Sequence, residues 1–314
     1  MRQIPIYLIS GFLESGKTCF LRDVLEGGDF DDGQKGLLIL CEEGEEEYDE
    51  TVLDGMNIEV ITVDDEEEFD SDFLQKCVKQ YNPKRVFMET NGVWDNKWMF
   101  EQPLPAGLVI AQVITVVDGS TFAVYLNNMR SILSNLFLYT EMVIFNRCTE
   151  EMDLQSYRRT VRGLNPRAMV YFEDEEGDPI DPGMDIPPYD LNAEIIQIED
   201  VDYGLWYLDA FENQDRYDGR KVRFRAKVMK SKRFPEGMFV PGRNAMTCCE
   251  DDIRFVGCLC RSEFTDLLKS RQWIWLTAQV SYVYQEEYGE EGPVLTGLSF
   301  ETAEAPEEDL VYFT

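Results

Sequence analysis

Short apolar segments alternate with amphipathic segments through the first half of the chain. The apolar segments are rich in β-branched residues and have few polar interruptions, which is typical of strands buried on both faces of a sheet. They lie at residues 4–9, 36–40, 58–63, 85–88, 108–117, 142–145 and 168–171. Apolar positions recur at helical spacing in residues 18–26, 71–81, 120–126 and 152–164. This alternation predicts an α/β domain with a parallel sheet wrapped by helices.

The pattern changes after residue 173. Residues 174–190 are acidic and rich in Pro and Gly, as is typical of a linker. A short helix is expected at 202–211, and residues 221–229 then alternate strictly between apolar and basic side chains. Further expected strands lie at 254–259, 273–283 and 294–301, with one helix at 263–270. We therefore expect a P-loop-type domain at 1–173, a linker at 174–190 and a small β-rich, OB-like barrel at 191–314.

The connection between the first predicted strand and helix carries Gly-Phe-Leu-Glu-Ser-Gly-Lys-Thr at residues 11–18. This segment matches the phosphate-binding P-loop pattern G-x-x-x-x-G-K-[ST]. A strand, a glycine-rich loop and a helix direct backbone amides and the positive helix end toward a phosphate. We expect Lys17 to reach the outer phosphates and Thr18 to bind Mg²⁺. The expected nucleotide contacts in this region are Gly11, Glu14, Ser15, Gly16, Lys17, Thr18 and Cys19.

Three more segments follow predicted strands and would lie at the same edge of the sheet. Glu89 begins a Glu-Thr-Asn-Gly sequence that suits Mg²⁺ coordination through water, with the Gly92 amide facing the terminal phosphate. Glu42 is a candidate for positioning a water or relaying a nucleotide-dependent switch. Asn146 and Arg147 occupy the place in which a GTPase carries Asn-Lys-x-Asp to recognise guanine.

Composition excludes several classes of partner. The net charge is −32, from 61 acidic and 29 basic residues, which argues against binding nucleic acid or anionic lipid. No apolar run approaches the roughly 20 residues that cross a bilayer, and no secretory signal is visible, so we expect a cytoplasmic protein without membrane insertion. The chain has no histidine, so a transition-metal site must use cysteine and carboxylate. Eight cysteines in such a protein indicate free thiols rather than disulfides.

The order of these motifs resembles the CobW-type family of GTP-dependent metallochaperones over residues 1–172. The resemblance rests on the P-loop at 11–18, Glu-x-x-Gly at 89–92, Val-Val-Asp at 116–118 and Asn-Arg at 146–147. It implies a protein that hydrolyses a nucleotide with Mg²⁺, in which Lys17, Glu42 and Glu89 act at the reacting phosphate.

The chain departs from the family pattern at three places. Glu14 replaces the usual glycine, and residues 51–75 contain no cysteine where the family carries Cys-x-Cys-Cys. An acidic run at 64–68 lies there instead, which we interpret as a solvated loop with a hard-cation site as the alternative. Thr149 replaces the guanine-binding aspartate, and a hydroxyl cannot accept the two hydrogen bonds that a carboxylate accepts from guanine. Glu150 is the alternative acceptor after a one-residue shift. The family resemblance therefore still favours GTP, and ATP is kept open as the alternative.

Half of the cysteines lie close together near the C-terminus, at Cys248, Cys249, Cys258 and Cys260. Four thiolates can complete a tetrahedral zinc site, although this is not the spacing of a zinc ribbon. The alternative is a set of small buried thiols in a barrel core. Residues 215–310 resemble the C-terminal domain of bacterial proteins associated with predicted permeases, because both carry an Arg-x-x-x-x-Cys-Cys segment, here at 243–249. That resemblance implies a transport-linked or metal-linked role.

Three functions follow from these observations. The first is a nucleotide-driven metallochaperone that delivers a metal, with zinc the candidate, to a client protein. The second is a regulatory adaptor without metal that contacts a permease-associated partner. The third is a nucleotide-binding scaffold that does not hydrolyse its ligand.

Overall fold

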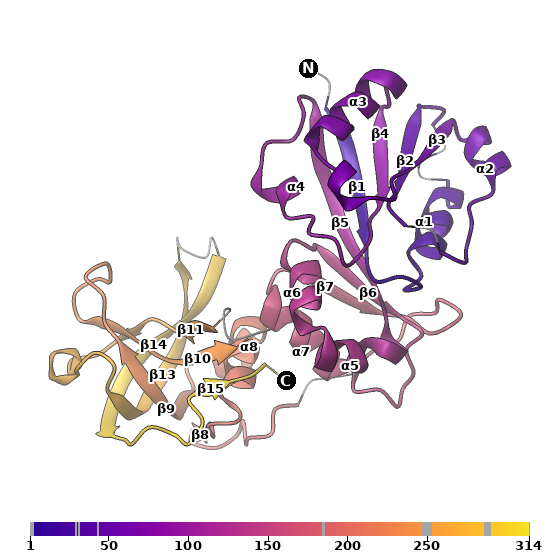
Figure 1. Cartoon of the computed structure of the whole chain (residues 1–314). Helices are drawn as coiled ribbons and strands as arrows, with labels where there is room; N and C mark the ends of the chain where they lie inside the picture. Colours follow the sequence, from indigo (N-terminus) through magenta and orange to yellow (C-terminus); the bar gives the residue numbers. More distant parts are fainter. Residues whose placement is uncertain are drawn as a thin grey trace. The chain divides into compact units, whose positions relative to one another are not determined.

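The computed structural model describes residues 3–28, 30, 32–42, 44–183, 186–246, 253–285 and 290–313. The chain divides into two compact units, Met1–Pro182 and Gly183–Thr314 (Figure 1). The division falls inside the predicted linker. Within the described ranges, no helix is both long enough and apolar enough to cross a membrane.

The first unit contains a seven-stranded sheet with the order β3-β2-β4-β1-β5-β6-β7. All neighbouring strands run parallel. The strands are β1 (Ile4–Ser10), β2 (Gly36–Leu40), β3 (Ile58–Thr62), β4 (Arg85–Glu89), β5 (Leu108–Asp118), β6 (Met142–Asn146) and β7 (Met169–Phe172). The predicted parallel sheet is confirmed. β1 lies in its interior, so the loop after it lies at the carboxyl edge, where α/β sheets bind ligands.

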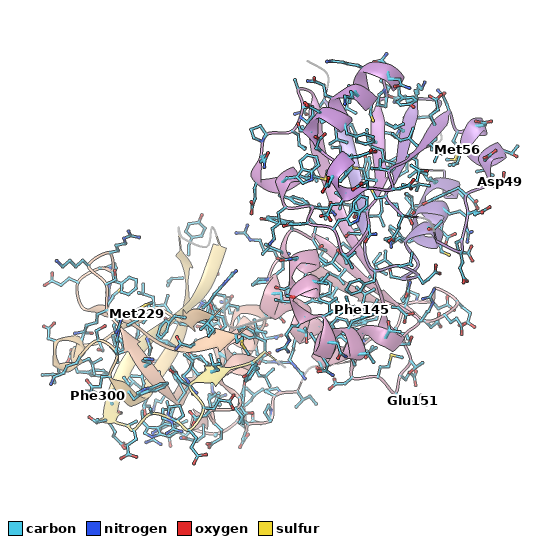
Figure 2. The ribbon with its side chains drawn as sticks, in the orientation of Figure 1. Asp49, Met56, Phe145, Glu151, Met229 and Phe300 are labelled. Carbon is cyan, nitrogen blue, oxygen red and sulfur yellow. The ribbon has the colours of Figure 1, made fainter. Side chains whose placement is uncertain are left out.

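Helices pack against both faces of this sheet. Leu21 and Leu25 of α1 (Lys17–Glu26) share one cluster with Leu53 of α2 (Glu50–Gly55) and with side chains of the central strands. The opposite face carries α3 (Ser71–Tyr81), α4 (Trp98–Glu101), α5 (Gly119–Asn128), α6 (Arg130–Leu138) and α7 (Leu154–Leu164). Phe145, labelled in Figure 2, is fully buried on that face. A short 3₁₀ turn, η1 (Glu66–Glu68), lies within the acidic run.

The second unit is a mixed β-sheet that closes into a barrel. Its strands are β8 (Ile195–Gln197), β9 (Lys221–Met229), β10 (Met238–Met246), β11 (Ile253–Gly257), β12 (Cys260–Arg261), β13 (Trp273–Gln285), β14 (Glu290–Thr302) and β15 (Leu310–Val311). The strand path is β11-β10-β12-β14-β13-β9-β8, and β10 also pairs with β9. The extra pairing closes a ring of five strands, β9-β10-β12-β14-β13. In this ring only β12 and β14 run parallel. The five-stranded ring agrees with the predicted OB-like barrel.

The barrel core follows the alternation seen in the sequence. Val222 and Phe224 of β9 are fully buried, whereas the basic residues that alternate with the buried positions of this strand face outward. Trp206 of α8 (Tyr203–Glu212) packs on Phe224 with 4.7 Å between ring centroids. A second short helix, α9 (Gln214–Tyr217), follows α8.

Two elements differ from the sequence prediction. The predicted helix at 263–270 is wrong, because only the 3₁₀ turn η3 (Thr265–Leu267) forms. The Thr265 hydroxyl donates to Gly237 O at 2.9 Å, and Leu268 then extends into the barrel core. The first part of the predicted linker belongs to the first unit. Glu173 pairs with Pro179, and the Ile180 amide donates to Phe172 O at 2.9 Å.

Candidate functional site

The two motif glycines shape the loop between β1 and α1. Gly11 has a φ of 147°, and a Cβ there would lie 2.3 Å from Val116 O. Gly16 precedes the helix with a φ of 95°, and its Cβ would lie 2.5 Å from Asn146 Nδ2. Both positions combine a positive φ with a close approach to neighbouring strands, so any larger residue collides. The fold therefore requires glycine at these two places.

Asn146 and Arg147, at the end of β6, hold the loop from the side. Asn146 Nδ2 donates to Ser15 O at 2.8 Å. Arg147 donates to Glu14 O at 2.9 Å and pairs with the Asp118 carboxylate at 2.7 Å. Both residues were predicted to recognise the base, and the contacts found here go to the phosphate loop. Their role toward a nucleotide base stays a prediction.

Lys17 lies almost completely buried at the start of α1, with 3% of its surface exposed. Its Nζ donates to Gly11 O at 3.0 Å and to Phe12 O at 2.8 Å. The same ammonium forms an ion pair with Glu42, in the loop after β2. Burial raises the pKa of the Glu42 carboxyl, and the Lys17 charge opposes that rise. The Glu42 carboxylate thus lies beside the Lys17 ammonium, in the position where the motif places a phosphate.

Thr18 and Glu89, the predicted Mg²⁺ residues, are in direct contact. Thr18 Oγ1 donates to Glu89 Oε1 at 2.7 Å, and Glu89 lies at the end of β4, paired with Ile9 of β1. Tyr48 Oη donates to the other carboxylate oxygen at 2.6 Å. Burial, followed by the charge of Glu89, raises the pKa of Tyr48, so this phenol remains a proton donor. One hydroxyl and one carboxylate are hard oxygen ligands, which fits the donor set that Mg²⁺ takes in nucleotide sites.

Glu14 connects the phosphate loop to the loop after β2. Its φ of 60° is left-handed, and its Oε1 accepts from the Glu45 amide at 3.1 Å. Arg22 of α1 pairs with Glu46 at 3.2 Å. The loop from Glu42 to Tyr48, which we call the β2 loop, is therefore fastened to the phosphate loop and α1 by several polar contacts. Residue 43 lies outside the described ranges.

A pocket of about 220 Å³ lies between these two loops. Lys17, Thr18 and Glu89 line it together with Cys19, Arg147 and acidic residues of the β2 loop. The structure thus brings together nearly all of the residues predicted for the phosphate end of the site. Sequence reasoning missed Tyr48, because no motif marks that position and its partner Glu89 is 41 residues away.

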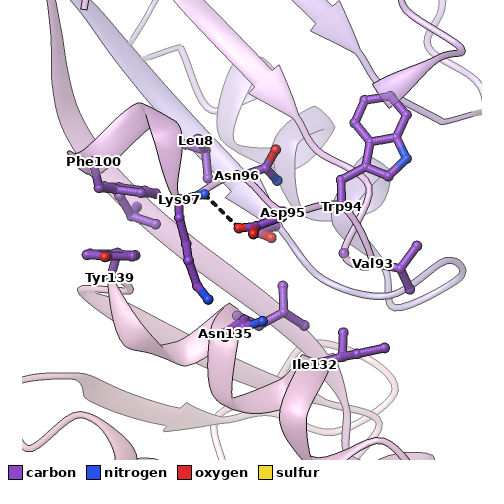
Figure 3. A pocket seen from close by; sticks show the side chains of 14 residues that line it. Leu8, Val93, Trp94, Asp95, Asn96, Lys97, Phe100, Ile132, Asn135 and Tyr139 are labelled. Carbon is purple, nitrogen blue, oxygen red and sulfur yellow. Dashed lines mark hydrogen bonds between the residues drawn. The ribbon is translucent and has the colours of Figure 1, made fainter. Parts of the chain in front are cut away.

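Gly92 packs closely on the phosphate loop, since a Cβ there would lie 2.3 Å from Gly11 O. The segment after it and helix α6 enclose a second pocket of about 70 Å³ (Figure 3). Figure 3 shows Lys97, Asn135 and Tyr139 around this cavity. This smaller cavity is lined by none of Lys17, Thr18 and Glu89. The pocket at Lys17 therefore remains the candidate nucleotide site.

The predicted zinc ligands divide into two groups. Cys248 and Cys249 lie outside the described residues. Cys258 and Cys260 are fully buried in the barrel core, and burial raises the pKa of each thiol to about 12. Burial among apolar side chains is what the alternative interpretation, small thiols in the barrel core, predicts, and zinc ligation by these two residues stays a prediction. In the part of the chain that the structure describes, no three His, Cys, Asp or Glu side chains are grouped to hold a metal.

Two family models match this chain. Residues 184–313 match the DUF1980 C-terminal domain, and residues 5–172 match the nucleotide-binding domain of CobW, HypB and UreG. A curated relative, the zinc chaperone CobW of Sinorhizobium sp., is 30% identical over 143 residues. That match covers 38% of this chain and 38% of the relative, so the chain spans well under half of the relative's length.

Solved structures show more distant likenesses. The hydrogenase maturation factor HypB from Archaeoglobus fulgidus is 14% identical with a TM-score of 0.39, covering 55% of this chain and 82% of that one. A Zn(II)-bound triple mutant of the YjiA GTPase is 19% identical with a TM-score of 0.44. The match covers 73% of this chain and 74% of that one. The family model covers more than half of the chain and includes the whole site described above. The chain belongs to the CobW/HypB/UreG nucleotide-binding family, and it carries a DUF1980 C-terminal domain after its nucleotide-binding domain.

Proposed function

We propose that this protein is a cytoplasmic, metallochaperone-like nucleotide hydrolase that uses a nucleoside triphosphate with Mg²⁺ to drive the handling of a metal or a partner protein. The observation that carries the proposal is the convergence of Lys17, Thr18 and Glu89 at the start of α1. These groups supply the charge, the hydroxyl and the carboxylate that phosphoryl transfer needs in P-loop proteins.

Each residue has a defined task in this proposal. Lys17 neutralises the outer phosphates, and the amides at the start of α1 bind phosphate oxygens. Thr18 and Glu89 are the residues that would hold Mg²⁺, Thr18 through its hydroxyl and Glu89 through a water. When bound, Mg²⁺ offsets the charge that develops on the phosphate oxygens. Glu42 is then free to orient the attacking water or to report on the terminal phosphate.

The β2 loop is the element that nucleotide binding would displace. A phosphate at Lys17 would compete with the Glu42 carboxylate, and a water held by Glu89 would compete with Tyr48. Both ligands therefore break contacts that hold the β2 loop on the phosphate loop. In nucleotide switches the terminal phosphate and Mg²⁺ hold such a loop in new contacts, and hydrolysis releases it. We therefore expect the β2 loop to be reordered around the bound phosphate and to be released on hydrolysis.

GTP is the favoured nucleotide in this proposal, and ATP is the alternative. Membership of the CobW family and the presence of Asn146 at the end of β6 support GTP. Thr149 in place of a carboxylate weakens the preference for guanine. We expect the discrimination between the two nucleotides to be small compared with that of a GTPase carrying aspartate there.

The proposed metal cargo is supported by a curated relative and by two cysteines of this chain. The related zinc chaperone supports a metal, and Cys248 and Cys249 are the remaining candidate thiols for it. The alternative function is a regulatory adaptor without metal that contacts a permease-associated partner. Cys258 and Cys260 lie fully buried among apolar side chains of the barrel core, as core thiols would, and this favours that alternative.

Two measurements test the proposal. Fluorescent GTP and ATP analogues, titrated with Mg²⁺ into the wild type and Lys17→Ala, should show binding that the variant loses. Elemental analysis of the purified protein should find zinc that disappears in Cys248→Ser/Cys249→Ser while nucleotide binding persists. Nucleotide binding without any metal affinity would favour the adaptor, and absence of nucleotide binding would reject both functions.

A further inference from the structure

The barrel unit has a concave site of its own on its outer wall. Its volume is about 470 Å³, within the roughly 300–1,000 Å³ typical of small-molecule sites. The lining comes from the connection between β9 and β10, from β10, β12 and β14, and from the end of β13. None of the motifs discussed above contributes to it, and the nucleotide proposal does not use it.

The floor of this site is aliphatic where a barrel wall is normally polar. Phe239 lies in the barrel core, so its neighbours Met238 and Val240 point to the outer face of β10. Outward positions of antiparallel strands usually face water and carry polar side chains. Here Met238, Val240 and Val294 line a common hollow, and Val240 is only 8% exposed.

Two arginines stand at the rim of this apolar floor. Arg233 belongs to the β9–β10 connection and Arg261 to β12, and both are exposed. No carboxylate lines the site within the described ranges, although the chain has 61 acidic and 29 basic residues. Several other arginines of the barrel are paired, as Arg225 and Arg243 are with Asp200.

We propose that this pocket binds an aliphatic carboxylate, with its apolar chain on the floor and its carboxylate on Arg233 and Arg261. A guanidinium matches the planar geometry of a carboxylate and can donate two parallel hydrogen bonds to it. The apolar tail gains from leaving water for the aliphatic floor. The ligand is either a free medium-chain carboxylate or the C-terminus of a peptide that ends in aliphatic residues.

The lining disfavours nucleic acid, although OB barrels often bind oligonucleotides between the corresponding loops. Single strands bind by stacking bases on aromatic side chains, and Phe234 is the one aromatic residue of the described lining. A polyanion would also be repelled by a chain with a net charge of −32, whereas a single carboxylate is affected much less.

Calorimetry on the full chain tests the proposal with five probes. Dodecanoate, below its micelle concentration, and acetylated Ala-Leu-Val-Leu with a free C-terminus represent the two sources of the ligand. The C-terminal amide of that peptide, dodecyltrimethylammonium and a ten-nucleotide thymidine strand are the contrasting probes. We expect one site for at least one carboxylate, with the peptide amide and the ammonium at least about tenfold weaker.

Variants connect the binding to the pocket. Arg233→Ala/Arg261→Ala should weaken the carboxylate at least about tenfold, from the loss of charge-assisted hydrogen bonds. Thr296→Trp, which fills the hollow from β14, should also weaken binding, whereas Lys269→Ala, exposed and outside the lining, should not. Circular dichroism establishes that each variant is folded. The proposal is overturned if neither carboxylate binds, if the ammonium binds as tightly, if the double variant binds normally, or if the thymidine strand is preferred.

Discussion

Replacing Glu42 by glutamine should tighten nucleotide binding, because it removes the anion that competes for Lys17. The Glu42 side chain is 8% exposed and the Lys17 side chain 2%, so their ion pair is almost fully buried. Glutamine keeps the size of the side chain and abolishes its charge. Nucleotide binding to the wild type must first break this pair, and the variant avoids that step.

The magnitude follows from the burial of the pair. A hydrogen bond to a charged group contributes about 1.5–3 kcal/mol. The raised pKa of Glu42 shows that desolvation opposes the pair, which places the net effect toward the lower end of that range. A change of about 1.4 kcal/mol corresponds to tenfold in affinity. We therefore expect Glu42→Gln to bind the nucleotide roughly tenfold more tightly.

A matched control is Glu46→Gln, which removes an exposed pair with Arg22 from the same loop. Exposed pairs contribute about 0–1 kcal/mol, so this variant should change the affinity less than about fivefold. The assay is a titration of a fluorescent GTP analogue with Mg²⁺ at pH 8 and again at pH 5.5. Because burial raises the pKa of Glu42 above that of an ordinary glutamate, lowering the pH should begin to protonate Glu42 earlier and so reduce the difference between variant and wild type. Equal or weaker binding of Glu42→Gln at pH 8 would refute the competition between Glu42 and phosphate.

Three further predictions concern the phosphate loop, the Asn146 side chain that contacts it, and the barrel. Gly11→Ala forces a Cβ to within 2.3 Å of Val116 O and should reduce nucleotide affinity at least about tenfold in the same titration, whereas Gly55→Ala, with nothing within 4 Å, should not. Asn146→Asp replaces the amide that donates to Ser15 O by a carboxylate and should weaken binding similarly, while Asn128→Asp on α5 leaves it unchanged. Buried Cys258 and Cys260 should resist iodoacetamide at pH 8 in the folded protein. Their raised pKa should make the barrel lose stability as the pH rises from about 9 to about 12, with a smaller loss in Cys258→Ala/Cys260→Ala, measured by circular dichroism.

The sequence predicted the parallel sheet well because its strands are buried on both faces and therefore continuous in apolar character. The elements that sequence reasoning missed lack such a continuous or periodic pattern. Strand β10 contains Pro241 and Gly242, which interrupt a strand pattern, yet both lie in the barrel wall. Helices α2 and α4 are only six and four residues long, too short for a helical period to emerge.

At the site, local motifs predicted which residues gather and could not predict what they contact. Lys17, Thr18 and Glu89 were recognisable because their chemistry depends on fixed spacing after a strand. The pairing of Lys17 with Glu42 and the hydrogen bond from Tyr48 to Glu89 depend on how the β2 loop folds back, which no spacing encodes. The bracing of Ser15 O by Asn146 spans 131 residues and arises only from the strand order.

Nucleotide hydrolysis at Lys17 is the central claim, and phosphate release measured with GTP and with ATP tests it most directly. The wild type should release phosphate in a Mg²⁺-dependent manner, faster with GTP than with ATP, and Lys17→Ala should release none above background. Absence of phosphate release from both nucleotides, or an unchanged rate in Lys17→Ala, would contradict the account.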